Sequence, residues 1–176
     1  HGPVGTDRAA FYRHLAPRVH LAALSWAQRR QAPDLRWSGV VYNGIRVATY
    51  PFSSRKEPYL LFLGRMSPDK GAHLAIEVAN TVGMRLMIAA KCTDPAERRY
   101  FEERIRPSLG RDIEWVGEAD AVEKRQLLTG ARCLLSPVQW EEPFGLVLVE
   151  ALACGTPVVD LRRGSVPEIV VEVVTG

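Results

Sequence analysis

The chain has 176 residues, of which 47% are hydrophobic and 24% are charged, and its formal net charge is +3. That length allows one domain, or one domain and part of another, with a core of useful size. The basic residues are scattered rather than gathered in runs with aromatic residues, which argues against nucleic-acid binding. Every apolar stretch ends well before the roughly 18 residues of a membrane span, and the first residues do not resemble a signal peptide. We expect a cytoplasmic protein with no transmembrane segment, and we leave peripheral attachment to a membrane open.

The three cysteines indicate neither a disulfide framework nor a metal site. Cys92, Cys133 and Cys154 lie far apart, and the sequence has no Cys-x-x-Cys pair. This usage is typical of buried, reduced thiols in a cytosolic protein. We therefore expect no bound metal and no cofactor.

The first 50 residues alternate between helical and extended patterns. We expect helices over residues 7–15 and 25–31, strands over 19–24 and 39–42, and a turn at Asn43-Gly44. Residues 51–58 contain two prolines and two serines and are predicted to be a linker. A domain boundary is placed there, between residues 1–50 and residues 59–176.

The remaining chain alternates regularly between short apolar runs and helical patterns. The expected strands are 59–64, 86–90, 113–117, 133–138 and 157–161, and the expected helices are 70–82, 95–109, 122–131 and 144–154. The last helix is followed by Gly155, a residue suited to ending a helix. Such alternation predicts an α/β fold with a doubly wound parallel sheet, similar to a Rossmann fold. Ligands of these sheets bind at the carboxyl ends of the strands.

The helix predicted over residues 144–154 contains a carboxylate in unusual surroundings. Glu150 lies among apolar residues, and a buried carboxylate needs a partner, so it is either a structural residue or a ligand-binding one. Glu142 precedes this helix, and Pro143 suits its first turn. The free amides of Phe144, Gly145 and Leu146 would then face an anion or a hydroxyl-rich ligand.

The spacing of the two carboxylates helps to choose between chemistries. If the segment is helical throughout, eight positions place Glu142 and Glu150 about 12 Å apart. Glycoside hydrolases need about 5 to 9.5 Å between their two carboxyl groups. The longer separation favours contacts with two ends of one long ligand, such as a sugar and a ribose.

A second segment of interest is Gly64-Arg65-Met66-Ser67-Pro68-Asp69-Lys70-Gly71. It follows the first strand of the predicted sheet and leads into a helix, so two cations flank a turn near a helix N-terminus. That geometry suits a diphosphate, although two basic residues alone also occur in solvated loops. The segment has neither the order of a P-loop nor that of a dinucleotide-binding fingerprint.

Together these segments resemble the retaining glycosyltransferases often grouped as family 4, which have the two-domain GT-B fold. The resemblance rests on Gly64-Arg65 to Lys70-Gly71, Glu142-Pro143-Phe144-Gly145 to Glu150-Ala151, Cys154-Gly155-Thr156-Pro157-Val158-Val159 and Gly164-Ser165-Val166-Pro167-Glu168-Ile169. These segments follow the order and spacing of that family over residues 59–170. The resemblance implies transfer of a sugar from a nucleotide donor, most often UDP- or GDP-linked, with retention of configuration.

The resemblance also implies a role for each matching residue. Arg65 and Lys70 match the pair that holds the donor diphosphate, with Gly64 beside them. Glu142 matches the acidic residue that faces the donor sugar. Glu150 matches the carboxylate that binds the ribose hydroxyls.

Backbone groups complete the implied donor site. The amides of Phe144, Gly145, Leu146 and Val147 match those that contact the sugar hydroxyls and the phosphate. The stretch from Glu118 through Ala119 and Asp120 to Lys124 matches the loop that binds the base.

The first 50 residues resemble the last third of the acceptor-side domain of the same family. His1 matches a histidine that faces the donor sugar across the cleft, so the implied catalytic set is His1, Arg65, Lys70 and Glu142. Complete members have two domains and about 300 residues, so the resemblance implies that this chain is an incomplete GT-B fold. The acceptor, whether glycan, lipid or small molecule, is not indicated.

Two other functions fit the same residues. One is a non-catalytic module that binds a nucleotide or nucleotide-sugar, and the other is a sugar-nucleotide epimerase on the same fold. A binding module has no need of a carboxylate that faces the sugar, so Glu142 disfavours it. An epimerase would change the sugar nucleotide without any acceptor.

Overall fold

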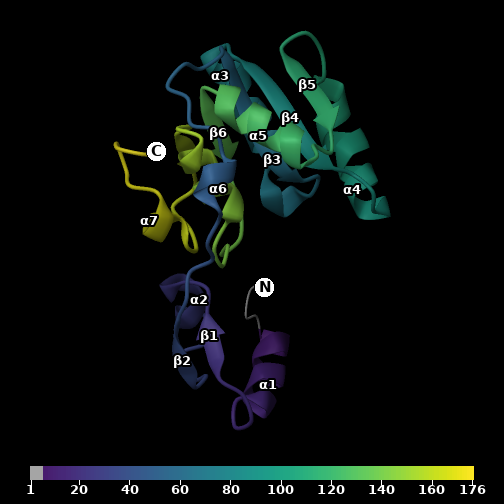
Figure 1. The fold of residues 1–176 in the computed structure, drawn as a ribbon. Helices are drawn as coiled ribbons and strands as arrows, with labels where there is room; N and C mark the ends of the chain where they lie inside the picture. Colours follow the sequence, from purple (N-terminus) through teal and green to yellow (C-terminus); the bar gives the residue numbers. More distant parts are fainter. Residues whose placement is uncertain (1–5) are drawn as a thin grey trace.

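The computed structural model describes residues 6–176, which form a small part and a larger part joined by the segment after the second strand (Figure 1). The small part contains α1 (Thr6–Leu15), β1 (Leu21–Ala23), α2 (Trp26–Arg30) and β2 (Trp37–Val40). The larger part contains the other five strands. No helix in this described range is long and apolar enough to cross a membrane.

The small part is built as a strand–helix–strand unit. β1 and β2 pair in parallel, and α2 connects them. Ser25 begins α2, because its hydroxyl accepts a hydrogen bond from the amide of Gln28 at 2.9 Å. Ala32 and Leu35 form a small core against Trp37. The second strand starts two residues earlier than the predicted residue 39, because Trp37 pairs with β1 and packs in this core.

The larger part is a five-stranded parallel sheet, which confirms the predicted α/β class. Its strands are β3 (Tyr59–Arg65), β4 (Arg85–Lys91), β5 (Ile113–Gly117), β6 (Cys133–Ser136) and β7 (Val158–Asp160). Their order is β5-β4-β3-β6-β7, so the chain moves outward from β3 and then returns to its other side. The strand order therefore reverses between β3 and β6, and a crevice is expected at their carboxyl ends.

The helices cover both faces of this sheet, as the doubly wound prediction requires. α3 (Ala72–Val82) and α4 (Pro95–Tyr100) pack on one core with Leu60 and Phe62 of β3. α5 (Ala121–Gly130) and α6 (Leu146–Ala153) pack on a second core with Tyr59 and Leu61. Alternate residues of β3 thus enter opposite cores, because side chains along a strand alternate between its faces. A short helix, α7 (Val166–Ile169), follows β7.

At three further element boundaries the structure differs from the prediction for a local reason. The helix expected from residue 70 starts at Ala72, because Gly71 has φ of +78° and separates α3 from the 3-10 turn η2 (Pro68–Lys70). The helix expected from residue 144 starts at Leu146, because Gly145 also has φ of +78°. The strand expected to reach residue 138 ends at Ser136, because Pro137 has no amide hydrogen to continue the ladder.

The single helix predicted over residues 95–109 is a series of three helical types. α4 is followed by the π-helical turn η3 (Phe101–Ile105) and the 3-10 turn η4 (Arg106–Ser108). Phe101 and Ile105 are both buried in the first core of the sheet. The sequence predicted one helix over these residues, and its pattern does not distinguish these hydrogen-bonding types.

The connecting segment contains the 3-10 turn η1 (Val47–Thr49) and then runs along the larger part. The amide of Ser53 donates to the carbonyl of Cys154 at 3.2 Å. The Lys56 ammonium donates to the carbonyls of Thr129 and Cys154, at 2.9 and 3.0 Å, and to the Thr156 hydroxyl at 2.7 Å. Residues 51–58, which were predicted to be a linker, are therefore attached to the larger part.

Candidate functional site

A pocket of about 380 Å³ opens at the carboxyl ends of β3 and β6, where the strand order reverses. Its polar and backbone lining comes from segments far apart in the sequence. It includes Gly64, Arg65, Lys70, Lys91, Glu118, Ala119, Ser136, Glu142, Gly145, Leu146, Val147 and Asp160. The position of the pocket is the one expected for a ligand of a doubly wound sheet.

Lys70 and Glu142 form an ion pair inside this pocket. The Lys70 ammonium lies 2.6 Å from a Glu142 carboxylate oxygen, and both side chains are about four-fifths shielded from solvent. The same ammonium lies 5.1 Å from the ring centre of Trp140. Arg65 is far more exposed, with a guanidinium nitrogen 4.0 Å from Asp69. A cation, a carboxylate and a second, more exposed cation therefore meet at one end of the pocket.

The start of α6 forms another wall. Because Gly145 precedes the helix, the amides of Leu146 and Val147 belong to its first turn, where amides have no partner within the helix. These amides lie at the positive end of the helix dipole, which favours a negative ligand. Phe144 itself is buried, and its carbonyl accepts from the Ser165 hydroxyl at 2.8 Å, so it lies behind this wall.

The expected helical separation of Glu142 and Glu150 does not apply. Glu142 lies outside α6, so a rise of 1.5 Å per residue cannot be extended back to it. The two carboxylates nevertheless have separate surroundings. Glu142 lines the pocket, whereas Glu150 lies within α6 with 7% of its surface exposed.

The segment after β7 holds the loop that carries Glu142. The amide of Ser165 donates to the Glu142 carbonyl at 3.0 Å, and the amide of Gly164 donates to the Glu141 carboxylate at 2.8 Å. A Cβ atom on Gly164 would lie 2.5 Å from the Glu142 nitrogen. Only glycine therefore allows this close approach of the two backbones.

Glu150 has two partners, as its burial requires. One carboxylate oxygen accepts from the Lys124 ammonium at 2.7 Å and from the Tyr50 hydroxyl at 2.7 Å. The pKa of Tyr50 rises to about 12, first because of burial and then because of this hydrogen bond. The structure thus joins Glu150 to Lys124, a residue predicted to lie in the base-binding stretch, and to Tyr50 of the connecting region.

The rest of that stretch lies at the end of β5. Glu118 and Ala119 line the pocket. Asp120 begins α5, and its carboxylate accepts from the amides of Val122 and Glu123 at 2.7 and 2.9 Å. Asp120 is therefore the N-terminal capping residue of α5.

The sequence analysis missed Asp160, Ser136 and Lys91, which also line the pocket. Asp160 ends β7, and its carboxylate accepts from the Leu161 amide at 2.7 Å. Burial raises the pKa of Asp160 to about 6, and the nearby Glu142 carboxylate adds to the rise. A polar residue at the carboxyl end of a predicted parallel strand was the signal that could have identified each of them.

A second pocket of about 320 Å³ lies beside the loop of residues 142–146. Leu24, Asn43 and Gly44 line it from the small part, and residues 142–146 line it from the other side. It shares Glu142, Gly145 and Leu146 with the first pocket. The two pockets therefore meet at the start of α6.

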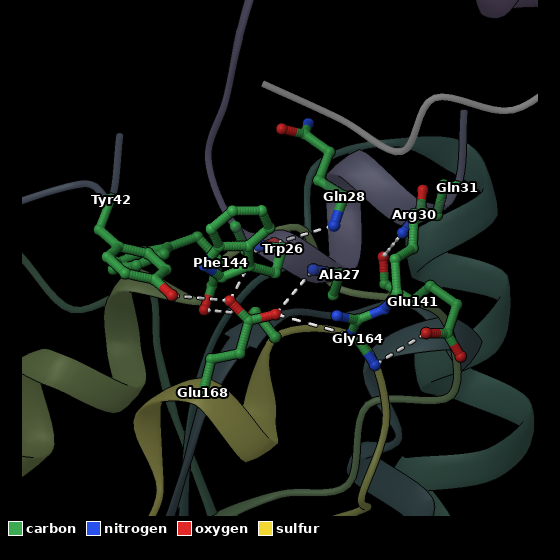
Figure 2. A network of polar contacts seen from close by, with 12 residues as sticks. Trp26, Ala27, Gln28, Arg30, Gln31, Tyr42, Glu141, Phe144, Gly164 and Glu168 are labelled. Carbon is green, nitrogen blue, oxygen red and sulfur yellow. Dashed lines mark hydrogen bonds and ion pairs between the residues drawn. The ribbon is translucent and has the colours of Figure 1, made fainter. Parts of the chain in front are cut away.

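A network of polar contacts joins the two parts of the chain beside this second pocket (Figure 2). Glu168 of α7 accepts hydrogen bonds from the amides of Trp26 and Ala27 and from the Tyr42 hydroxyl. Gln31 donates to the Glu141 carbonyl at 3.3 Å. The sequence analysis matched Glu168 to a family motif and assigned no role to its side chain.

His1 lies outside the described residues, so its predicted position opposite the donor sugar stays a prediction. Between residues 6 and 176, no group of three or more His, Cys, Asp or Glu side chains could hold a metal ion. Cys92, Cys133 and Cys154 are free thiols, and Cys154 is buried.

Comparison with protein families identifies the same region. The family model described as "Glycosyl transferases group 1" matches residues 51–176. Glycogen synthase of Mycobacterium tuberculosis is 33% identical over 153 residues, which are 82% of this chain and 36% of that protein. Alpha-maltose-1-phosphate synthase of the same species is 29% identical over 127 residues, which are 68% of this chain and 32% of that protein. The chain thus spans about a third of the length of these relatives.

Solved structures show the same fold. AviGT4, a glycosyltransferase involved in avilamycin A biosynthesis, has a TM-score of 0.74 and 33% identity, over 85% of this chain and 46% of that one. HepE of Anabaena, solved in complex with UDP and glucose, has a TM-score of 0.84 and 23% identity, over 98% of this chain and 53% of that one. At 23% identity, the similarity to HepE shows a shared fold only.

Proposed function

This chain belongs to the group 1 glycosyl transferases, and we propose from that premise that it binds a nucleotide-sugar donor and transfers the sugar to an acceptor with retention of configuration. The observation that carries the proposal is one pocket in which Lys70, Glu142 and the N-terminus of α6 meet. A cation and free amides suit the donor diphosphate, while a carboxylate suits sugar hydroxyls.

The geometry supports a mechanism based on charge stabilisation. Cleavage of the bond between sugar and phosphate leaves negative charge on the diphosphate and positive charge on the anomeric carbon. In the proposal, Lys70, Arg65 and the first amides of α6 stabilise the diphosphate, because they are fixed close to where its charge grows. Glu142 faces the sugar, and its ion pair with Lys70 holds both groups in place before the donor binds. No metal or cofactor takes part in this scheme.

In the proposal, Glu150 holds the ribose of the donor. The carboxylate oxygen that accepts from Lys124 and Tyr50 is already occupied, so the ribose hydroxyls would bind the other oxygen. Lys124 forms an ion pair with the buried Glu150 carboxylate at 2.7 Å, which holds this side chain in place. In the proposal, Ala119, which lines the pocket just after β5, contacts the base. UDP is the first nucleotide to test, since the structurally similar HepE was solved with UDP and glucose.

The acceptor and the cellular location stay predictions. The acceptor is a glycan, a lipid or a small molecule, and the second pocket beside Glu142 is open to it. The cytoplasmic location and the peripheral attachment to membranes considered for this chain need direct measurement.

The decisive experiment is calorimetric titration of the chain with UDP, GDP and ADP. We expect saturable binding of one of them, and we expect Glu150→Gln to weaken it by about 10- to 100-fold. The reason is that the ribose hydroxyls lose a charged acceptor, which contributes about 1.5 to 3 kcal/mol. The matched control is Glu77→Gln, on the exposed side of α3, which should leave the affinity unchanged.

Two outcomes would contradict the proposal. Failure of the folded wild-type chain to bind any of the three nucleotides would remove the donor site. Equal affinities of the wild type and of Glu150→Gln would leave Glu150 with a structural role only. A binding module would bind the nucleotide without turnover of any sugar nucleotide by the intact protein, and an epimerase would change the sugar in the absence of an acceptor.

A further inference from the structure

The Glu168 side chain connects the two parts of the chain. Its two carboxylate oxygens accept from the Trp26 amide at 2.9 Å and from the Ala27 amide at 2.6 Å, and one of them also accepts from the Tyr42 hydroxyl at 3.0 Å. Arg30 lies 3.7 Å away, and only 14% of the Glu168 side chain is exposed. Figure 2 shows these donors converging on the carboxylate from the small part.

The donors of this contact come from elements that need an acceptor. Trp26 and Ala27 are the first two residues of α2, and amides in a first turn have no partner within the helix. A carboxylate at that end also interacts favourably with the helix dipole. Glu168 is largely buried with three donors and a nearby cation, and its hydrogen bonds with α2 form only while α2 stays against α7.

The same short segment also holds the loop of Glu142. Gly164 and Ser165 contact the backbone of Glu142, and the Ser165 hydroxyl donates to the Phe144 carbonyl. Only a few residues separate these contacts from Glu168. Tyr42, whose hydroxyl donates a hydrogen bond to Glu168, also packs its ring against the Phe144 ring, and the two ring centres are 6.0 Å apart. Residues 164–168 therefore touch both the small part and the loop that carries Glu142.

We propose that Glu168 is a positioning residue, which holds the segment of residues 26–44 against the Glu142 loop. It thereby sets the shape of the second pocket. This inference rests on the proposed transfer reaction, because it takes that pocket as the place where an acceptor meets the donor sugar. Leu24, Asn43 and Gly44 form one wall of the pocket, and each lies within a few residues of a donor to Glu168. Displacement of a reacting group by about 1 Å is enough to slow a reaction about 100-fold.

The informative variant is Glu168→Gln, which keeps the size of the side chain. Its amide nitrogen is a donor and would face a donor of α2, so at least one of the three hydrogen bonds is lost. Tyr42→Phe removes a single hydrogen bond and serves as a milder variant. Glu172→Gln is the matched control, since that carboxylate lies on the same segment, is 80% exposed and pairs only with Arg162 among the described residues.

The first readout is amide hydrogen exchange at Trp26 and Ala27, measured by NMR on the full chain. We expect Glu168→Gln to accelerate exchange by at least tenfold at one or both of these amides, because the two amides bond different carboxylate oxygens and glutamine keeps only one acceptor oxygen. Glu172→Gln should leave both rates unchanged. Unchanged exchange in Glu168→Gln would overturn the inference, whatever the donor site does.

The second readout separates positioning from binding. In the intact protein, the affinity of Glu168→Gln for the nucleotide that binds wild type should stay within about threefold of the wild-type value. Its kcat with the best-bound donor among UDP-glucose, UDP-N-acetylglucosamine and GDP-mannose should fall about 10- to 100-fold. Tyr42→Phe should show a smaller fall in kcat. A parallel loss of nucleotide affinity, or an unchanged kcat, would overturn the inference. If wild type binds no nucleotide, the proposed function fails, and the exchange rates alone still decide whether Glu168 holds α2.

Discussion

At the scale of single residues, Asp160 shows how the fold alters a side chain. It lies at the end of β7, where burial raises its pKa to about 6 and the Glu142 carboxylate adds to this effect. Hydrogen bonds from Ser136 and from the Leu161 and Val138 amides oppose the rise without cancelling it. Near neutral pH the folded protein therefore holds a carboxylate that its surroundings disfavour.

Asp160→Asn should stabilise the protein relative to wild type by an amount that grows as the pH rises from about 4 to about 6. The folded pKa of about 6 exceeds the usual 3.8, so the native state binds the additional proton between these values and wild-type stability falls as pH rises through them. Asparagine keeps the acceptor for the Leu161 amide and carries no charge. The advantage of the variant should be absent near pH 3.5 and reach at most about 3 kcal/mol at pH 7. Urea unfolding at a series of pH values measures it, and curves that run parallel from pH 4 to 7 would show that the Asp160 pKa is not raised.

At the scale of elements, glycines with positive φ set how the pocket loops meet the helices. Gly71 separates η2, with Lys70, from α3, and a Cβ there would collide with the carbonyl of Pro137. Gly145 begins α6 and Gly164 lies against the backbone of Glu142. These residues allow loops from β3, β6 and β7 to approach one another more closely than side chains would permit.

Gly164→Ala should damage both stability and donor binding. Its Cβ would lie 2.5 Å from the Glu142 nitrogen, and the residue has φ of +53°, so the Glu142 loop must move. We expect a loss of about 2 to 4 kcal/mol in the free energy of unfolding, together with weaker binding of the nucleotide that binds wild type. Gly83→Ala is the matched control, because Gly83 has φ of +65° with open space around its Cβ position, and it should cost only about 1 kcal/mol. Equal effects of the two substitutions would show that the contact with Glu142 does not constrain the loop.

At the scale of the whole molecule, the connecting segment is part of the larger unit. Lys56 donates to three acceptors on α5, α6 and the turn before β7, and Tyr50 bonds Glu150. The Thr156 hydroxyl, which accepts from Lys56, itself donates to the Leu128 carbonyl. The segment that joins the two parts therefore also connects α5 to the end of α6 in the larger part.

Lys56→Met should lower the stability of the larger part. The substitution keeps much of the aliphatic stem and removes the ammonium, which leaves the buried Thr156 hydroxyl and two carbonyls with fewer donors. We expect a loss of about 1 to 3 kcal/mol, measured by urea unfolding. Arg55→Met, at the neighbouring exposed position, should change stability by less than about 0.5 kcal/mol. A loss shared by both variants would point to the segment as a whole rather than to the Lys56 contacts.

The sequence by itself determined the parallel α/β sheet and singled out most of the polar and backbone groups that line the first pocket. Buried strands such as β3 and β4 are continuous apolar runs, so their positions follow from local composition. Arg65, Lys70 and Glu142 stand beside the ends of such strands or the start of a helix, where parallel topology gathers ligand-binding groups. Their roles as donor ligands stay predictions until binding is measured.

Only the tertiary structure decided which side chains meet. Lys124 and Tyr50 pair with Glu150 over 26 and 100 residues of sequence, and Trp26, Ala27 and Tyr42 bond Glu168 over 126 to 142 residues. Asp160 became a pocket residue because β7 lies beside β6, which no local pattern specifies. Local sequence sets the backbone conformation, whereas the partner of a polar side chain depends on strand order and on the docking of the two parts.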